Sequence, residues 1–198
     1  MHLAGSLGTG AFASLLALRP DVRVGALHPL QSLPSVTVGL DRLPGSWAAI
    51  AGDPQVQDLA DALELRTFSV GDDQRARYHA TAVVASNHLV ALLGQVERLA
   101  VAAGVPFEAF APLAEASLAN AFGLGAQNAL TGPVARGDLA TVVGHLRDLP
   151  PSERDAYRAL AREAARLADN RDSALDRLLA DVLPTDSGGN AGPLEDKG

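Results

Sequence analysis

The strongest constraint on the fold of this chain is a change of pattern near residue 71. Before it, three short apolar runs typical of buried strands, residues 22–27, 46–51 and 65–70, alternate with helix-like segments. From Asp72 onward no strand-like run follows, and the chain has helical periodicity. This order predicts an α/β region with a parallel sheet, followed by an all-helical region.

Local start and stop signals divide these two regions further. We expect residues 1–71 to form part of a nucleotide-binding domain, residues 72–183 to form a helical C-terminal domain, and residues 184–198 to be a disordered tail. Helices are predicted over residues 8–18 and 54–63, and one long helix over residues 74–103, ended by Gly104. Further helices are expected near residues 107–119, 121–129, 138–147, 151–170 and 172–182.

The composition excludes several functional classes. The chain has 198 residues, 47% of them hydrophobic and 20% charged, which is enough apolar material to bury a core. A net charge of −7 without a dense basic run argues against a nucleic-acid partner. Because there is no cysteine and the five histidines lack metal-ligand spacing, we expect no metal site. With no export signal and no apolar run of about 20 residues, we expect a cytoplasmic protein without membrane spans.

The amino terminus reads like the later half of a nucleotide-binding domain. Residues 2–5 resemble the end of a strand and lead through residues 6–10 into a helix. Gly5, Gly8 and Gly10 do not have the Gly-x-Gly-x-x-Gly spacing that cradles a pyrophosphate. Three explanations for the missing glycine motif are expected: a misassigned start codon, a fragment, or a true short form. We therefore do not expect cofactor binding by this chain alone to be complete.

A polar run inside the predicted long helix is the first indication of function. Residues 78–90 place several hydrogen-bonding side chains among alanine and valine. At about 100° per residue, His79, Ser86 and Asn87 can face one cleft, whereas His88 points the other way. The axial gap from His79 to Asn87 is about 12 Å, which suits a small molecule lying along the helix. The run is either such a ligand site or a polar network between helices.

Two further segments have a functional and a structural interpretation. His28 and Pro29 directly follow a predicted strand, so they either line the nicotinamide side of a cleft or form a turn. Arg136 lies in a glycine-flanked loop before Asp138, which is placed to cap the next helix. Its guanidinium either grips a carboxylate or phosphate or is a solvated surface group.

Taken in order, these segments resemble a known family. Residues 1 to about 165 are similar to Rossmann-like proteins that carry a C-terminal domain of unknown function (DUF 2520), which is itself similar to the helical domain of 6-phosphogluconate dehydrogenase. The resemblance rests on four segments: residues 2–5, 28–32, 78–88 and 130–138. It implies a truncated Rossmann-like parallel sheet followed by a helical domain of the 6-phosphogluconate dehydrogenase type, which commonly forms the dimer.

The resemblance implies an NAD(P)-dependent oxidoreductase that acts on a small oxo or hydroxy acid, with NADP or NAD as cofactor. Related hydroxyacid dehydrogenases place a lysine four residues before the active-site asparagine, where this chain has Val83. If Asn87 is that asparagine, His79 is the nearest titratable substitute.

The predicted site residues fall into three groups by role: His79 and Asn87 for catalysis, Ser86 and Arg136 for substrate binding, and Gly5, Ser6, His28 and Pro29 for cofactor binding. The alternative function is a non-enzymatic helical module, a dimer that binds a partner and keeps a vestigial nucleotide-binding fold.

Overall fold

The structure, a computed structural model, describes residues 1–169 and 173–180. The chain divides into two compact units, unit 1 from Met1 to Gly94 and unit 2 from Gln95 onward. The domain ranges 1–71 and 72–183 inferred from the sequence stay a prediction, and the predicted tail, residues 184–198, lies outside the described residues.

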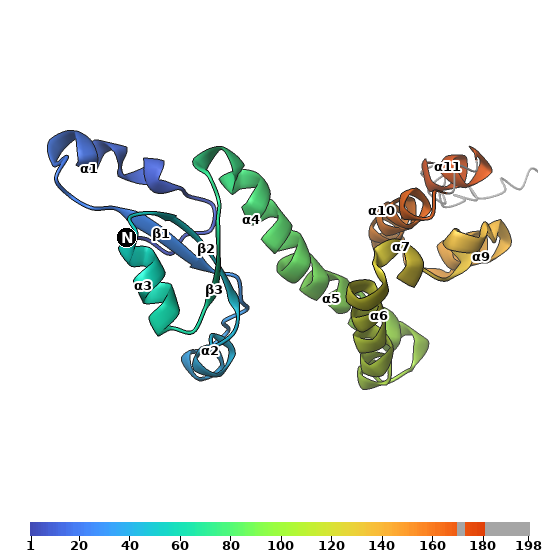
Figure 1. Cartoon of the computed structure of the whole chain (residues 1–198). Helices are drawn as coiled ribbons and strands as arrows, with labels where there is room; N and C mark the ends of the chain where they lie inside the picture. Colours follow the sequence, from blue (N-terminus) through green and yellow to red (C-terminus); the bar gives the residue numbers. More distant parts are fainter. Residues whose placement is uncertain (170–172, 181–198) are drawn as a thin grey trace, which may run out of the picture. The chain divides into compact units, whose positions relative to one another are not determined.

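Unit 1 contains a three-stranded sheet close to the predicted positions (Figure 1). The strands are β1 (Gly25–Pro29), β2 (Trp47–Gly52) and β3 (Arg66–Ser69). Its helical segments are η1 (Thr9–Phe12), α1 (Ala13–Leu18), α2 (Val36–Arg42), α3 (Gln55–Ala62), η2 (Asp72–Gln74), α4 (Arg75–Val83) and η3 (Val84–His88). The predicted strand end at the amino terminus forms a parallel bridge between His2 and Ala26.

The sheet is mixed, which corrects the expectation of parallel pairing throughout. β2 and β3 run parallel, as expected, whereas β1 and β2 run antiparallel with Leu27 opposite Ile50. A parallel crossover needs a helix that packs its apolar stripe back onto the sheet. α2 buries only Gly39 among its seven residues, so it does not form such a crossover. After α2 the chain instead enters β2, which lies beside β1 and runs in the opposite direction.

The core of unit 1 lies between the sheet and α3. Val56 and Ala60 are four residues apart and therefore share one face of α3. They pack against Leu27, Ala48 and Leu65, all of them buried. Full burial of a valine or leucine side chain contributes about 1.5–3 kcal/mol, so this small cluster is what holds the β2–α3–β3 segment together.

The predicted long helix is present, with one interruption. Helical backbone runs from Arg75 to Ala103, through α4, η3 and α5 (Leu89–Ala103). η3 is a π-helical turn, which inserts one residue into the helical repeat and often occurs at functional sites. Gly104 follows at φ +68°, a left-handed conformation that glycine adopts without a steric penalty, so the predicted helix end is confirmed.

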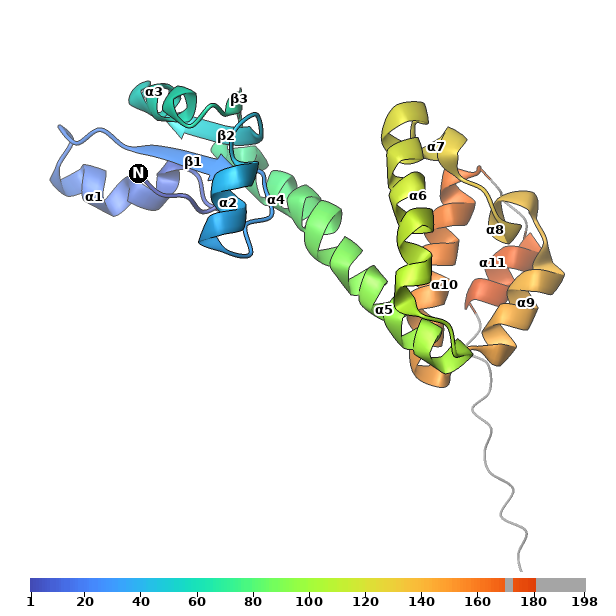
Figure 2. The ribbon, with the colours of Figure 1, turned by 90° about the horizontal axis from the view of Figure 1, so that it is seen from below.

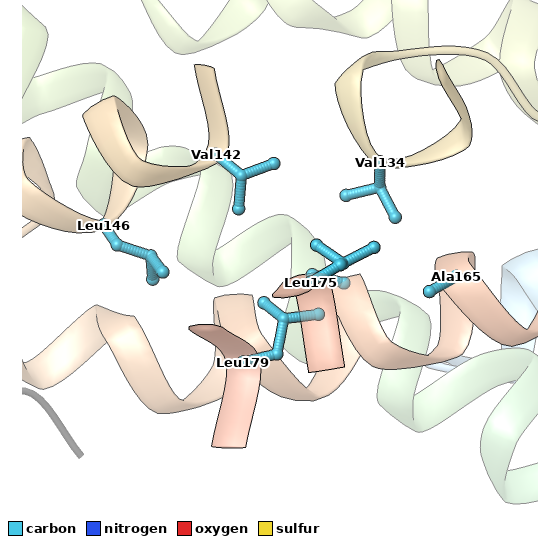
Figure 3. Packing of buried hydrophobic residues seen from close by; sticks show 7 residues of the cluster. Val134, Val142, Leu146, Ala165, Leu175 and Leu179 are labelled. Carbon is cyan, nitrogen blue, oxygen red and sulfur yellow. The ribbon is translucent and has the colours of Figure 1, made fainter. Parts of the chain in front are cut away.

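Within its described residues, the regular elements of unit 2 are all helices (Figure 2). After α5 its elements are η4 (Phe107–Phe110), α6 (Ala111–Leu124), α7 (Ala126–Ala129), α8 (Pro133–Arg136), α9 (Leu139–Asp148), α10 (Pro151–Leu167) and α11 (Ser173–Ala180). Its core joins α8, α9, α10 and α11 (Figure 3). The buried members are Val134, Val142, Leu146, Ala161, Ala165, Leu175 and Leu179.

Two carboxylates position the helices of unit 2. Asp138 accepts hydrogen bonds from the Thr141 backbone N–H at 3.1 Å and from the Thr141 hydroxyl at 2.7 Å, which confirms it as a helix cap. Glu153 accepts two hydrogen bonds from Arg98, at 2.7 and 3.0 Å, so α5 and α10 are joined by a bidentate ion pair. The hydrogen bonds from Thr141 and from Arg98 lower the pKa of Asp138 and of Glu153, respectively.

In the described ranges, no helix combines the length and the apolar character that crossing a bilayer requires. Within the same ranges, no three histidine, aspartate or glutamate side chains lie close enough together to hold a metal ion.

Candidate functional site

A pocket of about 600 Å³ opens in unit 1 beside the carboxyl end of β1. Its wall consists of residues 28–32, of which His28 and Pro29 are the last two residues of β1 rather than a loop after it, Phe68 of β3, and residues of α4 and η3 between 78 and 87. Five residues named from the sequence line it: His28, Pro29, His79, Ser86 and Asn87. The tertiary structure therefore brings two of the predicted segments, distant in the sequence, to one cavity.

His28 and Tyr78 form the best-defined contact of this pocket. Tyr78 Oη lies 2.6 Å from His28 Nδ1, and the two rings meet edge to face with centroids 5.6 Å apart. Tyr78 also packs edge-on against Phe68, which holds the phenol in place. The pair joins the strand end to α4.

The surroundings of the pair set its protonation. Partial burial, followed by the nearby charges of His79 and Arg75, lowers the pKa of His28. Burial raises the pKa of Tyr78, although Arg75 opposes that effect. At neutral pH the imidazole is therefore neutral and the phenol protonated. Assigning Tyr78 as donor to Nδ1 leaves the imidazole proton on Nε2.

His79 lies next to this pair, separated from His28 by a glycine. The ring centroids of His28 and His79 are 6.2 Å apart. A Cβ atom placed on Gly5 would come within 2.7 Å of His28 Nε2 and Cε1 and of His79 Cδ2. Gly5 does not line the pocket, but only a residue without a side chain lets both rings approach the backbone there.

Ser86 and Asn87 are exposed to the pocket on the π-helical turn. Ser86 Oγ lies 2.9 Å from the Ala82 carbonyl oxygen and 3.0 Å from Asn87 Oδ1, so one hydroxyl proton serves two acceptors. No hydrogen bond within the described residues engages the Asn87 amide nitrogen, which is free to donate to a ligand. Together they offer a donor and acceptors for a carbonyl or hydroxyl group.

Two predicted site residues lie elsewhere. Ser6 is exposed and outside the pocket wall. Arg136 is the last residue of α8, exposed, and belongs to unit 2 rather than to unit 1, where the pocket lies.

Within the described residues, the glycine-rich turn near the amino terminus has no open site for the diphosphate of a dinucleotide. The only glycine-rich turn that opens a helix near the first strand segment is at Gly8–Gly10, and there Asp72 accepts hydrogen bonds from Thr9 N at 3.0 Å and Gly10 N at 2.7 Å. A carboxylate therefore already occupies the amide groups to which a phosphate would bind.

Sequence reasoning missed two residues of this region. Tyr78 opens the polar run, but it received no role because its partner, His28, is fifty positions away. Arg75 is buried to 1% exposure although arginine is normally solvated. The available signal was its spacing: Arg75 precedes Tyr78 by three residues and His79 by four, which places all three on one helix face.

Comparisons with known proteins agree with this fold. Residues 48–164, more than half of the chain, match a family described as a domain of unknown function (DUF2520). No curated protein matches the sequence significantly. Among solved structures, protein TM1727 from Thermotoga maritima is similar with a TM-score of 0.67 and 23% identity, over 85% of this chain and 68% of that one. The "putative NADP oxidoreductase BF3122" from Bacteroides fragilis is similar with a TM-score of 0.68 and 22% identity, over 83% of this chain and 64% of that one.

Proposed function

Since this chain belongs to the DUF2520 family, whose function its description leaves open, we propose that it is the substrate-binding part of an NAD(P)-dependent oxidoreductase acting on a small oxo or hydroxy acid. The observation that carries the proposal is the convergence of His28, His79, Ser86 and Asn87 on one pocket at a strand end. Small-molecule sites are commonly clefts in which a few polar groups converge. The name of the similar Bacteroides fragilis protein supports the redox chemistry and the choice of NADP.

In this proposal the residues have separate tasks. The Asn87 amide and the Ser86 hydroxyl bind the carbonyl or hydroxyl oxygen of the substrate. His79 supplies or takes up the proton at that oxygen, because an imidazole can act as a general acid or base. His28 and Pro29 form the wall against the nicotinamide ring, with Tyr78 fixing the orientation of the His28 imidazole. A bound nicotinamide cofactor supplies the hydride chemistry.

The experiment is a titration of the chain with NADPH, followed by the fluorescence of Trp47, the single tryptophan. Trp47 packs against Phe68 of the pocket wall, with ring centroids 6.1 Å apart, and so reports on occupancy. We expect saturable quenching that weakens about tenfold in His28→Ala, because His28 forms the wall against the nicotinamide ring, and that is unchanged in Asn120→Ala, an exposed asparagine of α6. NADPH oxidation with a panel of 2-oxo acids, slowed about 10²-fold in His79→Gln, tests the chemistry.

A non-enzymatic binding module remains the second candidate. The specific observation in its favour is the Asp72 carboxylate on the amide groups of Thr9 and Gly10, which leaves no open phosphate site at that helix start. Saturable NADPH binding contradicts this candidate. A chain that neither binds NADPH nor turns over any 2-oxo acid contradicts the oxidoreductase.

We also propose that the chain forms a homodimer through α6 of unit 2. The helix is mostly apolar in sequence, yet none of its residues is buried, and Phe122 is 86% exposed. Large exposed apolar side chains gathered on one helix are normally covered by a partner. Sedimentation should show a dimer in the parent protein and a monomer in Phe122→Asp. Leu18→Asp in α1 alters a comparably exposed residue of unit 1 and should leave the dimer intact.

A further inference from the structure

Arg75, the first residue of α4, combines two properties that rarely occur together. It is 1% exposed, and none of its three guanidinium nitrogens has a hydrogen-bond partner among the described residues. Arg158, another buried arginine, differs because its Nη1 pairs with Asp155 in unit 2. A buried charge without a counter-ion is costly, so an anion bound nearby would stabilise it.

The position of Arg75 connects that charge to the pocket. On a helix, residues three and four positions apart are neighbours, and the two residues so related to Arg75 are Tyr78 and His79, both in the pocket wall. Its charge acts on His28 and Tyr78, whose pKa values it lowers. Arg75 does not line the pocket itself, so its influence there is electrostatic.

The pocket wall leaves this charge uncompensated. The wall contains histidine, neutral polar and apolar side chains, and no aspartate, glutamate, lysine or arginine. Asp73 and Asp72 are the acidic residues nearest to Arg75 in the sequence. The Asp72 carboxylate accepts hydrogen bonds from the backbone N–H groups of Thr9 and Gly10. A positive charge held away from water and near a pocket without carboxylates favours an anion in that pocket over a neutral molecule of the same shape.

We propose that Arg75 is the residue that makes this pocket selective for small carboxylates. The inference rests on the proposed function in naming a carboxylate rather than another anion, and it gives Arg75 the part that the sequence analysis gave Arg136. Arg75 is a specificity-determining residue that acts through the wall formed by Tyr78 and His79.

The test compares an acid with its neutral isostere. The imidazole proton resonances of His28 and His79 are followed by NMR while the full chain is titrated with 2-oxobutyrate or with 2-oxobutyramide. We expect the parent protein to bind the acid about tenfold more tightly than the amide, the two to bind equally in Arg75→Met, and the preference to persist in Arg75→Lys. Arg77→Met is the matched control, because Arg77 is an exposed arginine of the same helix.

The outcomes separate this inference from the proposed function. A parent protein that binds the acid no better than the amide overturns the inference, and so does an Arg75→Met variant that keeps the preference. Either result leaves the NADPH titration, which uses no carboxylate, as an independent test of the oxidoreductase. A third titration with inorganic phosphate identifies the anion: tight phosphate binding with no response to 2-oxobutyrate overturns the assignment to a carboxylate.

One measurement needs no ligand and guards against a misfolded variant. Removing the Arg75 charge should raise the pKa of His28, as read from its NMR titration, whereas Arg77→Met should not. A pKa of His28 that does not change in folded Arg75→Met overturns the electrostatic link on which the inference depends.

Discussion

Each unit contains a histidine and tyrosine pair of nearly the same geometry. In unit 1, Tyr78 Oη lies 2.6 Å from His28 Nδ1, with ring planes at 84°. In unit 2, Tyr157 Oη lies 2.7 Å from His145 Nδ1, with ring planes at 88°. Burial raises the pKa of both tyrosines. Their local geometry alone does not distinguish the two pairs.

Their surroundings differ. His28 is half-buried, lines a pocket, and lies near a second histidine and a buried arginine. His145 is an exposed residue of α9, and its contact with Tyr157 joins that helix to α10. The comparison teaches that the same hydrogen bond is a candidate functional group in one place and a connection between helices in the other. The adjacent pocket and the nearby charged side chains distinguish the pair in unit 1 from the pair in unit 2.

The largest expected difference between the pairs is in turnover. In Tyr78→Phe the His28 imidazole loses the partner that orients it, so we expect NADPH-dependent reduction of a 2-oxo acid to fall 10- to 100-fold. In Tyr157→Phe the rate should stay within about twofold, while the loss of one hydrogen bond lowers the free energy of unfolding by about 1 kcal/mol. Initial rates and urea unfolding measure both. Equal rate losses in the two variants would break the comparison.

A glycine next to each pair provides the second contrast. In Gly5→Ala the new methyl group meets His28 and His79 at 2.7 Å, and we expect about 1–3 kcal/mol of destabilisation together with weaker ligand binding. Gly144 precedes His145 within α9 and has nothing within 4 Å of its added Cβ. Gly144→Ala should therefore stabilise the protein by about 0.5–1 kcal/mol through helix propensity. Thermal unfolding measures whether each substitution raises or lowers the stability. A stabilised Gly5→Ala would show that the rings of His28 and His79 can move apart freely.

The smallest effect is a pH dependence of stability. The pKa of His28 is lowered by folding, so between that value and the unfolded value of about 6.5 the unfolded chain binds more protons. The free energy of unfolding should then fall as the pH drops below about 6.5, with a contribution below about 1.4 kcal/mol per pH unit. Urea titrations at several pH values should show this contribution in the parent protein and in His145→Gln, and lose it in His28→Gln. An unchanged slope in His28→Gln would contradict the assigned pKa direction.

Prediction from sequence succeeded where the signal was local. Proline, glycine and aspartate marked helix starts and ends, such as Asp138 and Gly104, because caps depend on residues only a few positions apart. It was wrong about the pairing of β1 with β2, because strand direction depends on how the connecting helix packs and α2 buries almost nothing. The π-helical turn at Ser86 and Asn87 was not foreseen either, since the helical pattern continues on both sides of it.

By itself the sequence determined the order of the two regions, the positions of most helices and strands, and the polar residues that merit attention, because periodicity and capping are encoded within a few neighbouring residues. Only the tertiary structure decided that His28 meets Tyr78 and that Arg75 is buried without a partner. Those facts depend on contacts between residues far apart in the chain and on the exclusion of water, and neither is written in local spacing.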